Sequence, residues 1–307
     1  NGLQHYAALG RDEIGAVSVN LAPSERPNDV YSDVAAEVEK LRQSDTESSV
    51  AKTLEGFVNR KVIKQTVMTY VYGVTRYGAK LQITKRLKED ETFPQDHCWT
   101  ASLYLTHKTF DSIQNMFNAT RKIQDWFTNC ARTISNVLAS PVEWITPLGF
   151  PIVQPYFKKS SNAIKKKDGI LSLKTDHSRW KPNTLKQKNA FPPNFIHSLD
   201  SSHMMLTALH CEKEGITFAA VHDSYWTHPC NIDDMNRICR EQFVALHSEP
   251  ILSDLSKFMV EKYEPLLGKM YDENSEEYTK ILDLLKSVPE TGSFDLTNVM
   301  KSTYFFS

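Results

Sequence analysis

The sequence predicts an α+β fold in which helix predominates. Apolar residues recur at helical spacing in several long stretches, which include 59–78, 98–117 and 119–138. Two short stretches, 142–154 and 216–227, combine strand-forming residues with a turn, and each predicts a hairpin. The 307 residues, of which 40% are hydrophobic, permit a sizeable core in one large domain or about two. No apolar run approaches the roughly 18 residues of a membrane span.

Composition narrows the function classes. The formal net charge is −1, which argues against a simple basic nucleic-acid binder. The charge is uneven, however, because 158–188 is rich in Lys and Arg whereas the C-terminal part is rich in Asp and Glu. The five cysteines include no Cys-x-x-Cys pair and are odd in number, so neither a zinc ribbon nor a disulfide framework is predicted. We expect free thiols in a reducing compartment.

The first long element is a capped amphipathic helix. A proline-interrupted connection at 20–27 precedes it, and its pattern extends from Val30 to Leu41. Asn28 and Asp29 supply the cap, because short polar side chains accept hydrogen bonds from the first free N–H groups of a helix. Its inner face is formed by apolar residues at helical spacing, which are Val30, Val34, Val38 and Leu41. A polar break at 44–49 separates it from the central element.

The central element is a helix predicted over 59–73. Its apolar stripe consists of Ile63, Val67, Tyr70 and Val74. Beside that stripe, four residues recur at every fourth position, namely Arg60, Lys64, Met68 and Tyr72. Such a row suits a nucleoside triphosphate, because the cations face phosphates while the thioether and the ring face base and sugar. Gly73 leaves room for a close backbone or base. On spacing alone, a solvated basic helix face is the alternative.

A hairpin and a basic segment follow the helices at 98–117 and 119–138. β-branched residues flank Pro147-Leu148-Gly149 within 142–154, and this pattern predicts two strands joined by a turn. The basic residues after the hairpin fit phosphate contact, each neutralising about one phosphate. They are Lys158, Lys159, Lys165, Lys166 and Lys167. A solvated loop is the alternative interpretation of this segment.

A helix predicted from Phe191 to about Leu209 carries His197, Asp200 and His203 at i, i+3 and i+6. This spacing suggests a transition-metal site, but we reject it because such a site needs three or four ligands and no further His or Cys is paired with these.

Asp223 is the strongest candidate for a metal ligand. The stretch 216–221 predicts a short buried strand, and 225–227 runs back from it. A carboxylate on the turn between two strands is rigid and exposed, which suits magnesium. Asp is also common in turns because it bonds to the backbone. The part from Met235 to about Leu285 is helical, and the chain ends in an aromatic segment at 304–306 that we expect to pack on the protein.

Four motifs together resemble one known family. They are Arg60-Lys61-x-x-Lys64-x-x-x-Met68-x-x-x-Tyr72-Gly73, Trp144-x-Thr146-Pro147-x-Gly149-x-Pro151, Pro192-x-Asn194-Phe195-x-His197-Ser198 and His222-Asp223-Ser224. The chain resembles the single-subunit, bacteriophage-type DNA-directed RNA polymerases over essentially its whole length, most of all the animal mitochondrial members. The resemblance implies the fingers and partial palm of a right-hand polymerase fold. Its parts would be palm at 1–13, fingers at 14–197 with a nucleic-acid-contacting hairpin loop at about 142–188, and palm at 198–307.

The resemblance also implies a reaction, which is DNA-templated RNA synthesis by nucleotidyl transfer. The implied partners are a DNA template, nascent RNA, ribonucleoside triphosphates and mitochondrial initiation factors, and the implied location is the mitochondrial matrix. Two Mg²⁺ ions would clamp the attacking and leaving oxygens, with Asp223 as a catalytic ligand. Arg60 and Lys64 would hold the triphosphate, and Lys64 is also a candidate proton donor.

Further residues carry over with the motifs. Met68 and Tyr72 would lie near the new base pair, with Tyr72 selecting the sugar through the 2′ hydroxyl. Gly73 would let the template approach, and His197 would face the nucleic acid and the initiating nucleotide. Tyr31 matches a family tyrosine near the catalytic centre, although a core aromatic is equally compatible with its pattern.

One expected residue is not in the sequence. Residues 1–6 and 10–16 resemble the stretch that follows the first catalytic aspartate of the family, so that aspartate would precede Asn1. We therefore expect a C-terminal fragment that binds nucleotide and nucleic acid but is inactive alone. A metal-dependent phosphoesterase is the other alternative, but it would need several acidic ligands clustered in this chain.

Overall fold

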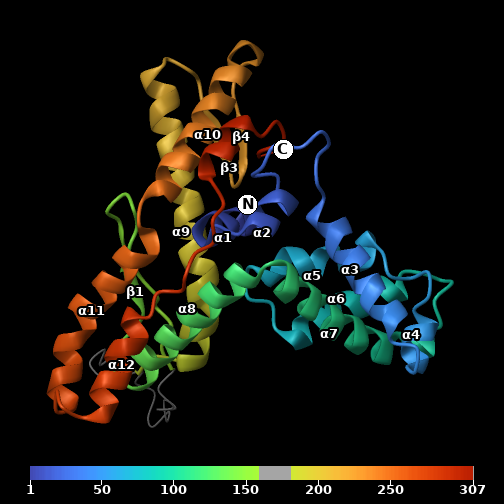
Figure 1. Ribbon diagram of the computed structural model, residues 1–307, viewed down its shortest axis with the longest axis horizontal. Helices are drawn as coiled ribbons and strands as arrows, with labels where there is room; N and C mark the ends of the chain where they lie inside the picture. Colours follow the sequence, from blue (N-terminus) through green and yellow to red (C-terminus); the bar gives the residue numbers. More distant parts are fainter. Residues whose placement is uncertain (159–180, 307) are drawn as a thin grey trace, which may run out of the picture. The chain divides into compact units, whose positions relative to one another are not determined.

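The computed structural model describes residues 1–158 and 181–306 (Figure 1). Helix predominates in it, as the sequence predicts, and the strands of the described residues form two separate antiparallel pairs. Contacts divide the chain into two compact units. The first consists of Asn1–Gln124, Pro192–Ile251 and Pro289–Ser307, and the second of Asp125–Phe191 and Leu252–Val288. No helix among the described residues combines the length and the apolar character that crossing a membrane requires.

A helical bundle forms one part of the first unit. Figure 1 shows α3, α5, α6 and α7 side by side, and each packs against at least two of the others. Apolar side chains such as Val38, Ile63, Ile83 and Leu105 are completely buried there. The elements from the N-terminus through the bundle are α1 Gly2–Gly10, α2 Glu13–Ser18, α3 Val30–Ser44, α4 Ser49–Thr53, α5 Arg60–Tyr70, α6 Arg76–Lys88, a 3₁₀ turn at Gln95–His97, and α7 Cys98–Met116.

Helix α3 begins where the sequence predicts. The Asp29 side chain accepts a hydrogen bond from the backbone N–H of Tyr31, which caps the helix start. Val34 and Val38 are fully buried, so the predicted inner face packs on the bundle. This fixed start matters below, because Asp29 and Tyr31 border a cavity.

The central helix is shorter than predicted. α5 ends at Tyr70, and Val71 to Gly73 form a turn. Gly73 has φ of 76°, a left-handed conformation that glycine adopts at little cost and that no helix continues through. Thr75 then caps the start of α6 by accepting from the N–H of Gly78. The predicted helix over 59–73 is therefore wrong beyond Tyr70, and Tyr72 and Gly73 lie on a connection.

Helix α9 starts earlier than predicted, at Thr184 rather than at Phe191, and runs to Lys213. Pro192 and Pro193 lie inside it, although proline removes a backbone donor. Asn183 accepts from the N–H of Lys186 at the true start, and the buried Phe191 and Phe195 flank the proline pair. Packing of these side chains maintains a helix that the prolines alone would interrupt.

The predicted hairpin around Asp223 is confirmed, but its first strand is not buried. β3 Ala219–Val221 pairs with β4 Ser224–Trp226, with Val221 opposite Ser224. Val221 is 55% exposed, because one face of this two-stranded ribbon has no layer against it. Phe218 and Tyr225 on its other side pack on a buried cluster of Cys211, Ile216, Met235 and Ile238. The hairpin therefore rests on α9 and on α10, which spans Ile232–Ser248.

The end of the chain returns to its beginning within the first unit. The N–H of Gly292 donates to the carbonyl of Gly10 (2.8 Å), and the N–H of Phe294 donates to Arg11 (3.1 Å). A Cβ on Gly292 would lie 2.3 Å from the Arg11 carbonyl oxygen, so only glycine fits there. The segment continues through a 3₁₀ helix at Leu296–Lys301 that packs on α10.

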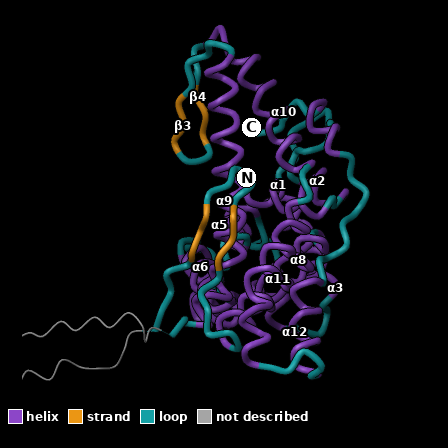
Figure 2. Tube along the Cα trace, turned by 90° about the vertical axis from the view of Figure 1, so that its left-hand side faces the viewer, coloured by secondary structure: helices purple, strands orange, loops and turns teal. Residues whose placement is uncertain are grey.

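The second unit contains the predicted hairpin and three helical segments. β1 Glu143–Ile145 pairs with β2 Pro151–Val153, which confirms that prediction (Figure 2). Trp126 donates from its indole N–H to the carbonyl of Leu284 (3.0 Å), which joins two segments far apart in sequence. The remaining elements, some shared with the first unit, are α8 Asn118–Asn136, α11 Ile251–Met270 and α12 Glu276–Lys286. A further 3₁₀ turn lies at Pro229–Asn231 in the first unit.

Candidate active site

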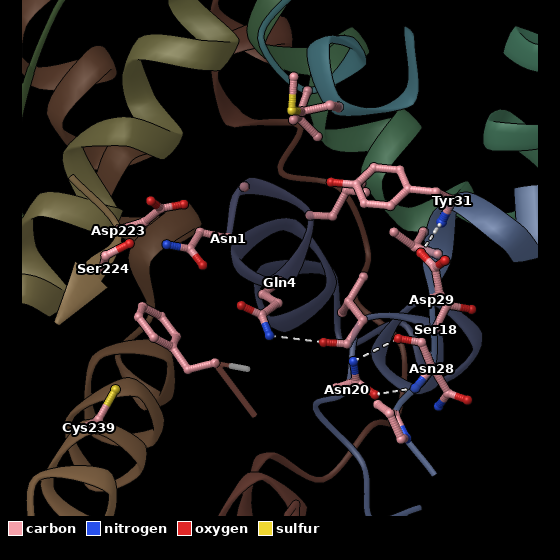
Figure 3. A pocket seen from close by; sticks show the side chains of 18 of the residues that line it. Asn1, Gln4, Ser18, Asn20, Asn28, Asp29, Tyr31, Asp223, Ser224 and Cys239 are labelled. Carbon is pink, nitrogen blue, oxygen red and sulfur yellow. Dashed lines mark hydrogen bonds between the residues drawn. The ribbon is translucent and has the colours of Figure 1, made fainter. Parts of the chain in front are cut away.

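A cavity of about 800 Å³ lies within the first unit. Its lining comes from six places in the sequence, which are the start of α1, the segment 18–31, α5 with the turn after it, the β3–β4 turn, α10 and the C-terminal segment. Figure 3 shows Asp223 and Tyr31 on opposite sides of it. Among the residues singled out from the sequence, the lining includes Tyr31, Arg60, Met68, Tyr72 and Asp223.

Asp223 occupies the turn between β3 and β4. Its side chain is exposed, and the preceding His222 has φ of 54°, which closes the turn tightly. The paired strands and the packing of Tyr225 beneath them fix the position of this turn. The described residues hold no group of three or more His, Cys, Asp or Glu side chains with metal-binding geometry.

Arg60 and Lys64 gather over one aromatic ring. The Arg60 guanidinium carbon lies 5.3 Å from the centroid of the Tyr31 ring, and the Lys64 ammonium lies 5.5 Å from it. Both side chains begin one turn apart on α5, so the ring of Tyr31 on α3 attracts both cations. The arrangement brings two cations to one ring, and of the two Arg60 also lines the cavity.

Asp29 holds the same arginine. Its Oδ2 accepts a hydrogen bond from Arg60 Nε at 2.5 Å and another from Ser32 Oγ at 2.7 Å. Partial burial alone would raise the pKa of Asp29, but the hydrogen bonds from Arg60 and Ser32 lower it on balance. The carboxylate is therefore ionised at neutral pH and forms an ion pair with Arg60.

Tyr72 stacks on His197. Their ring centroids are 4.8 Å apart and the planes differ by 10°. Tyr72 is 40% exposed and Met68 is 43% exposed, so both present apolar surface beside the cavity. Burial, and then the negative charges of Asp200 and Asp223, raise the pKa of the Tyr72 phenol, which keeps its proton at neutral pH. The turn at Gly73 sets the ring against the histidine.

A buried chain of polar side chains behind this pair was not predicted. His5 Nδ1 lies 2.9 Å from His247 Nε2, and His5 Nε2 lies 3.3 Å from Asp200 Oδ1. Burial lowers the pKa of His5 and of His247, so both imidazoles are neutral at pH 7. The hydrogen bonds tie α1 to α9 and α10. The spacing of Asp200 from His197 was visible in the sequence, but its partner lies 195 residues away.

The aromatic end of the chain packs beside the Asp223 hairpin. Phe306 lines the cavity and its ring lies 4.9 Å from that of Tyr225. Phe305 is buried against Phe243, with 5.0 Å between ring centroids. Arg240 donates to the carbonyl of Ser302 (3.1 Å), which anchors the segment to α10. The prediction that this end packs on the protein is confirmed.

The predicted phosphate-contacting lysines lie in another part of the chain. Lys158 is exposed in the second unit, and its N–H donates to the carbonyl of Lys181 (2.8 Å). Lys159, Lys165, Lys166 and Lys167 lie outside the described residues. His203, the last member of the rejected metal triplet, is fully buried, and its Nε2 lies 2.8 Å from the carbonyl oxygen of Cys239.

Comparison with known proteins gives a consistent set of relatives. A family model described as DNA-dependent RNA polymerase matches residues 1–307. The whole chain is 56% identical over 315 residues to "DNA-directed RNA polymerase, mitochondrial" of Mus musculus and 57% identical over 312 residues to the Homo sapiens protein of that name. It spans 26% and 25% of their lengths, that is, about a quarter. "DNA-directed RNA polymerase 2A" of Nicotiana tabacum is 44% identical over 316 residues, which cover the whole chain and 89% of that relative.

Proposed function

The chain belongs to the DNA-dependent RNA polymerase family, and from this premise we propose that it is part of an enzyme that synthesises RNA on a DNA template in mitochondria. The names of its mammalian relatives support both the reaction and the location. The observation that carries the proposal is the cavity itself, whose lining includes the exposed carboxylate of Asp223 together with Arg60 and Tyr72. Lys64 shares the Tyr31 ring with Arg60, and His197 stacks on Tyr72. Nucleotidyl transfer uses a metal-binding carboxylate and cations that stabilise phosphate charge.

We propose that Asp223 is a ligand of catalytic Mg²⁺. Its carboxylate fits that ion, because it is a hard oxygen donor on a rigid turn at the edge of the cavity. Bound Mg²⁺ would supply positive charge for the attacking 3′ oxygen and for the leaving pyrophosphate in a two-metal site. The described residues offer no cluster of three acidic or histidine ligands. Mg²⁺ in polymerase sites retains water and binds substrate phosphates, so one carboxylate is a sufficient contribution from this turn.

Arg60 and Lys64 bind the triphosphate in this proposal. Cations that bind phosphate oxygens neutralise the charge that the leaving pyrophosphate develops. Lys64 can also donate a proton to the leaving group, whereas the guanidinium of Arg60 holds its proton and acts through charge and hydrogen bonds. Their common position over Tyr31 keeps both on the same side of the cavity.

Tyr72 selects the sugar, Met68 supports the new base pair, and His197 contacts the nucleic acid. The stacked ring of Tyr72 places its hydroxyl beside the cavity, where it can hydrogen-bond a 2′ hydroxyl group. A deoxynucleotide would leave that polar group without its partner. Gly73 has no side chain to obstruct a template base next to Tyr72. His197 is exposed and can contact the nucleic acid from its free face.

The remaining assignments concern larger parts of the chain. We propose that residues 14–197 form the fingers and that 1–13 and 198–307 belong to the palm. The basic segment after β2, with Lys158, Lys159, Lys165, Lys166 and Lys167, contacts nucleic-acid phosphates. The partners are then a DNA template, nascent RNA and ribonucleoside triphosphates, together with mitochondrial initiation factors.

The test is primer extension by the full-length protein on an RNA-primed DNA template. Asp223→Ala should reduce nucleotide incorporation by at least about a thousandfold, as expected for loss of a metal ligand at the reacting atoms. Asp233→Ala is the matched control, because Asp233 is an exposed aspartate on α10 outside the cavity lining. Normal extension by Asp223→Ala would refute the assignment of the catalytic turn.

We also propose that residues 1–307 alone bind nucleotide without catalysis. One carboxylate ligand cannot hold two metal ions close together, and the described residues contain no further cluster of ligands beside it. The same observation weighs against a phosphoesterase, which would need several such ligands.

A further inference from the structure

The Asp29 carboxylate accepts hydrogen bonds from two different helices. Its Oδ1 accepts from the N–H of Tyr31 (3.2 Å) and so caps α3, while its Oδ2 accepts from Arg60 Nε (2.5 Å) on α5. Ser32 Oγ donates to the same Oδ2 at 2.7 Å. The cap of α3 therefore fixes the orientation of the carboxylate, and Arg60 binds to it from a position 31 residues further along the chain.

The contact uses only one edge of the guanidinium. Arg60 donates to Asp29 through Nε, and within residues 1–158 and 181–306 neither of its Nη nitrogens has a hydrogen-bond acceptor in the protein. The side chain is 48% exposed and borders the cavity. Its guanidinium carbon lies 5.3 Å from the centroid of the Tyr31 ring, so the ring limits movement of the guanidinium on that side while the Asp29 hydrogen bond restricts its rotation. The two Nη groups remain available for a bidentate contact with phosphate oxygens.

We propose that Asp29 is a positioning residue, which orients Arg60 so that its free Nη groups meet the triphosphate of the incoming nucleotide. This inference rests on the proposed function, in which Arg60 binds phosphate. An unrestrained arginine loses considerable rotamer freedom when it binds a ligand. An arginine that is already held by Asp29 and Tyr31 has lost much of that freedom before the nucleotide arrives, so binding is stronger.

Asp29 can also weaken nucleotide binding, because its negative charge repels phosphate. A carboxylate beside the triphosphate site lowers the local positive charge, and removal of its charge would then strengthen nucleotide binding. Both partners of the ion pair are substantially exposed, at 48% and 36%, so water screens this repulsion. The orientation of the Arg60 guanidinium depends on its direct contacts, which water and salt do not screen. We therefore expect positioning to dominate, and the two effects have opposite signs in an experiment.

Asp29→Asn removes the negative charge but keeps the helix cap. Asparagine is as good a cap as aspartate, so α3 keeps its start while the charged partner of Arg60 is removed. The full-length enzyme is assayed by single-nucleotide primer extension, in which KM for the ribonucleoside triphosphate and kcat are measured separately. We expect KM to rise about two- to fivefold, the range for loss of a partly exposed ion pair, with kcat changed by less than about twofold.

Asp33→Asn is the matched control for charge. Asp33 is exposed on the first turn of the same helix and has no ion pair with Arg60 among the described contacts. It loses the same charge a turn away, so any general electrostatic effect appears in both variants. We expect its KM to fall slightly or to stay unchanged.

Arg60→Ala distinguishes failure of this inference from failure of the proposed function. If Arg60→Ala raises KM and Asp29→Asn has no further effect in that background, positioning through Arg60 is supported. If Arg60→Ala raises KM but Asp29→Asn alone leaves it unchanged or lowers it below the Asp33→Asn value, the inference is overturned and the proposed function stands. An equal rise from Asp29→Asn in both backgrounds shows a merely structural role and also overturns it. If Arg60→Ala leaves KM unchanged, the phosphate-binding role of Arg60 fails, and the inference fails with it.

Discussion

Replacement of Tyr72 by Phe should relax the choice between ribonucleotides and deoxyribonucleotides while the protein remains as stable as before. Within the described residues the Tyr72 hydroxyl has no hydrogen-bond partner, and the side chain is 40% exposed, so its removal leaves no buried group unpaired. The free energy of unfolding should therefore change by less than about 0.5 kcal/mol. The ring stack on His197 is retained, because phenylalanine presents the same aromatic face.

The size of the effect follows from the hydrogen bond that is lost. A hydroxyl–hydroxyl bond contributes about 0.5 to 1.5 kcal/mol, and an unpaired polar group in a closed site costs about 1 to 3 kcal/mol. Since 1.4 kcal/mol corresponds to a factor of about ten, the ratio of kcat/KM for a ribonucleotide to that for its deoxy analogue should fall about ten- to a hundredfold. Most of the change should come from faster use of the deoxynucleotide.

The assay is single-nucleotide primer extension by the full-length protein with matched ribo- and deoxyribonucleoside triphosphates. Tyr77→Phe serves as the control, because Tyr77 is an exposed tyrosine close in sequence that does not line the cavity. If Tyr72→Phe keeps the wild-type ratio, or loses activity equally with both sugars, the hydroxyl does not select the sugar. The stacked pair would then act only as a surface for the base.

Two further predictions concern stability and catalysis. Burial lowers the pKa of His203 to about 4, from about 6.5 when exposed. As the pH falls, His203 of the unfolded state takes up a proton near pH 6.5, whereas His203 of the folded state does so only near pH 4. The contribution of this residue to the free energy of unfolding should therefore be constant above about pH 6.5 and decrease between pH 6.5 and 4, by at most about 3 kcal/mol. Denaturant unfolding at pH 7 and pH 5 measures this change in the free energy of unfolding. His203→Gln should reduce the difference between the two pH values, and an unchanged difference would show that His203 is not the group responsible. Separately, the isolated 307-residue chain should bind a fluorescent ribonucleotide but extend no primer, and template-dependent extension by the purified chain would contradict the proposal that its single carboxylate is insufficient.

Local signals in the sequence were enough for elements whose cause is local. Helix α3 was predictable because the Asp29 cap and the valine spacing both lie within it. The Asp223 turn was predictable because an apolar run precedes it and aromatic residues follow it. In each case residues less than one element apart determine the backbone conformation, so periodicity and capping rules suffice.

Features that depend on the sign of a backbone φ angle, or on contacts between residues far apart in the sequence, were not predictable. Periodicity continues through Tyr72, but the positive φ of Gly73 ends the helix, and a pattern of apolar residues carries no information about that angle. Burial of β3 was predicted from composition, whereas exposure is decided by whether another layer covers it. The His5–Asp200 contact and the Asp29–Arg60 ion pair join residues 195 and 31 positions apart, for which spacing rules offer no signal.

The pairing of Gly292 with Gly10 has a consequence for the time course of biosynthesis. A ribosome synthesises the α1 segment long before residues 292–306, so the backbone bonds between the two segments form only after those later residues have been translated. Until then Gly10, Asn20 and Tyr225 lack the neighbours that Gly292, Ser302 and Phe306, respectively, later provide. Nascent chains are therefore open to proteases and chaperones at the very surface that becomes the cavity.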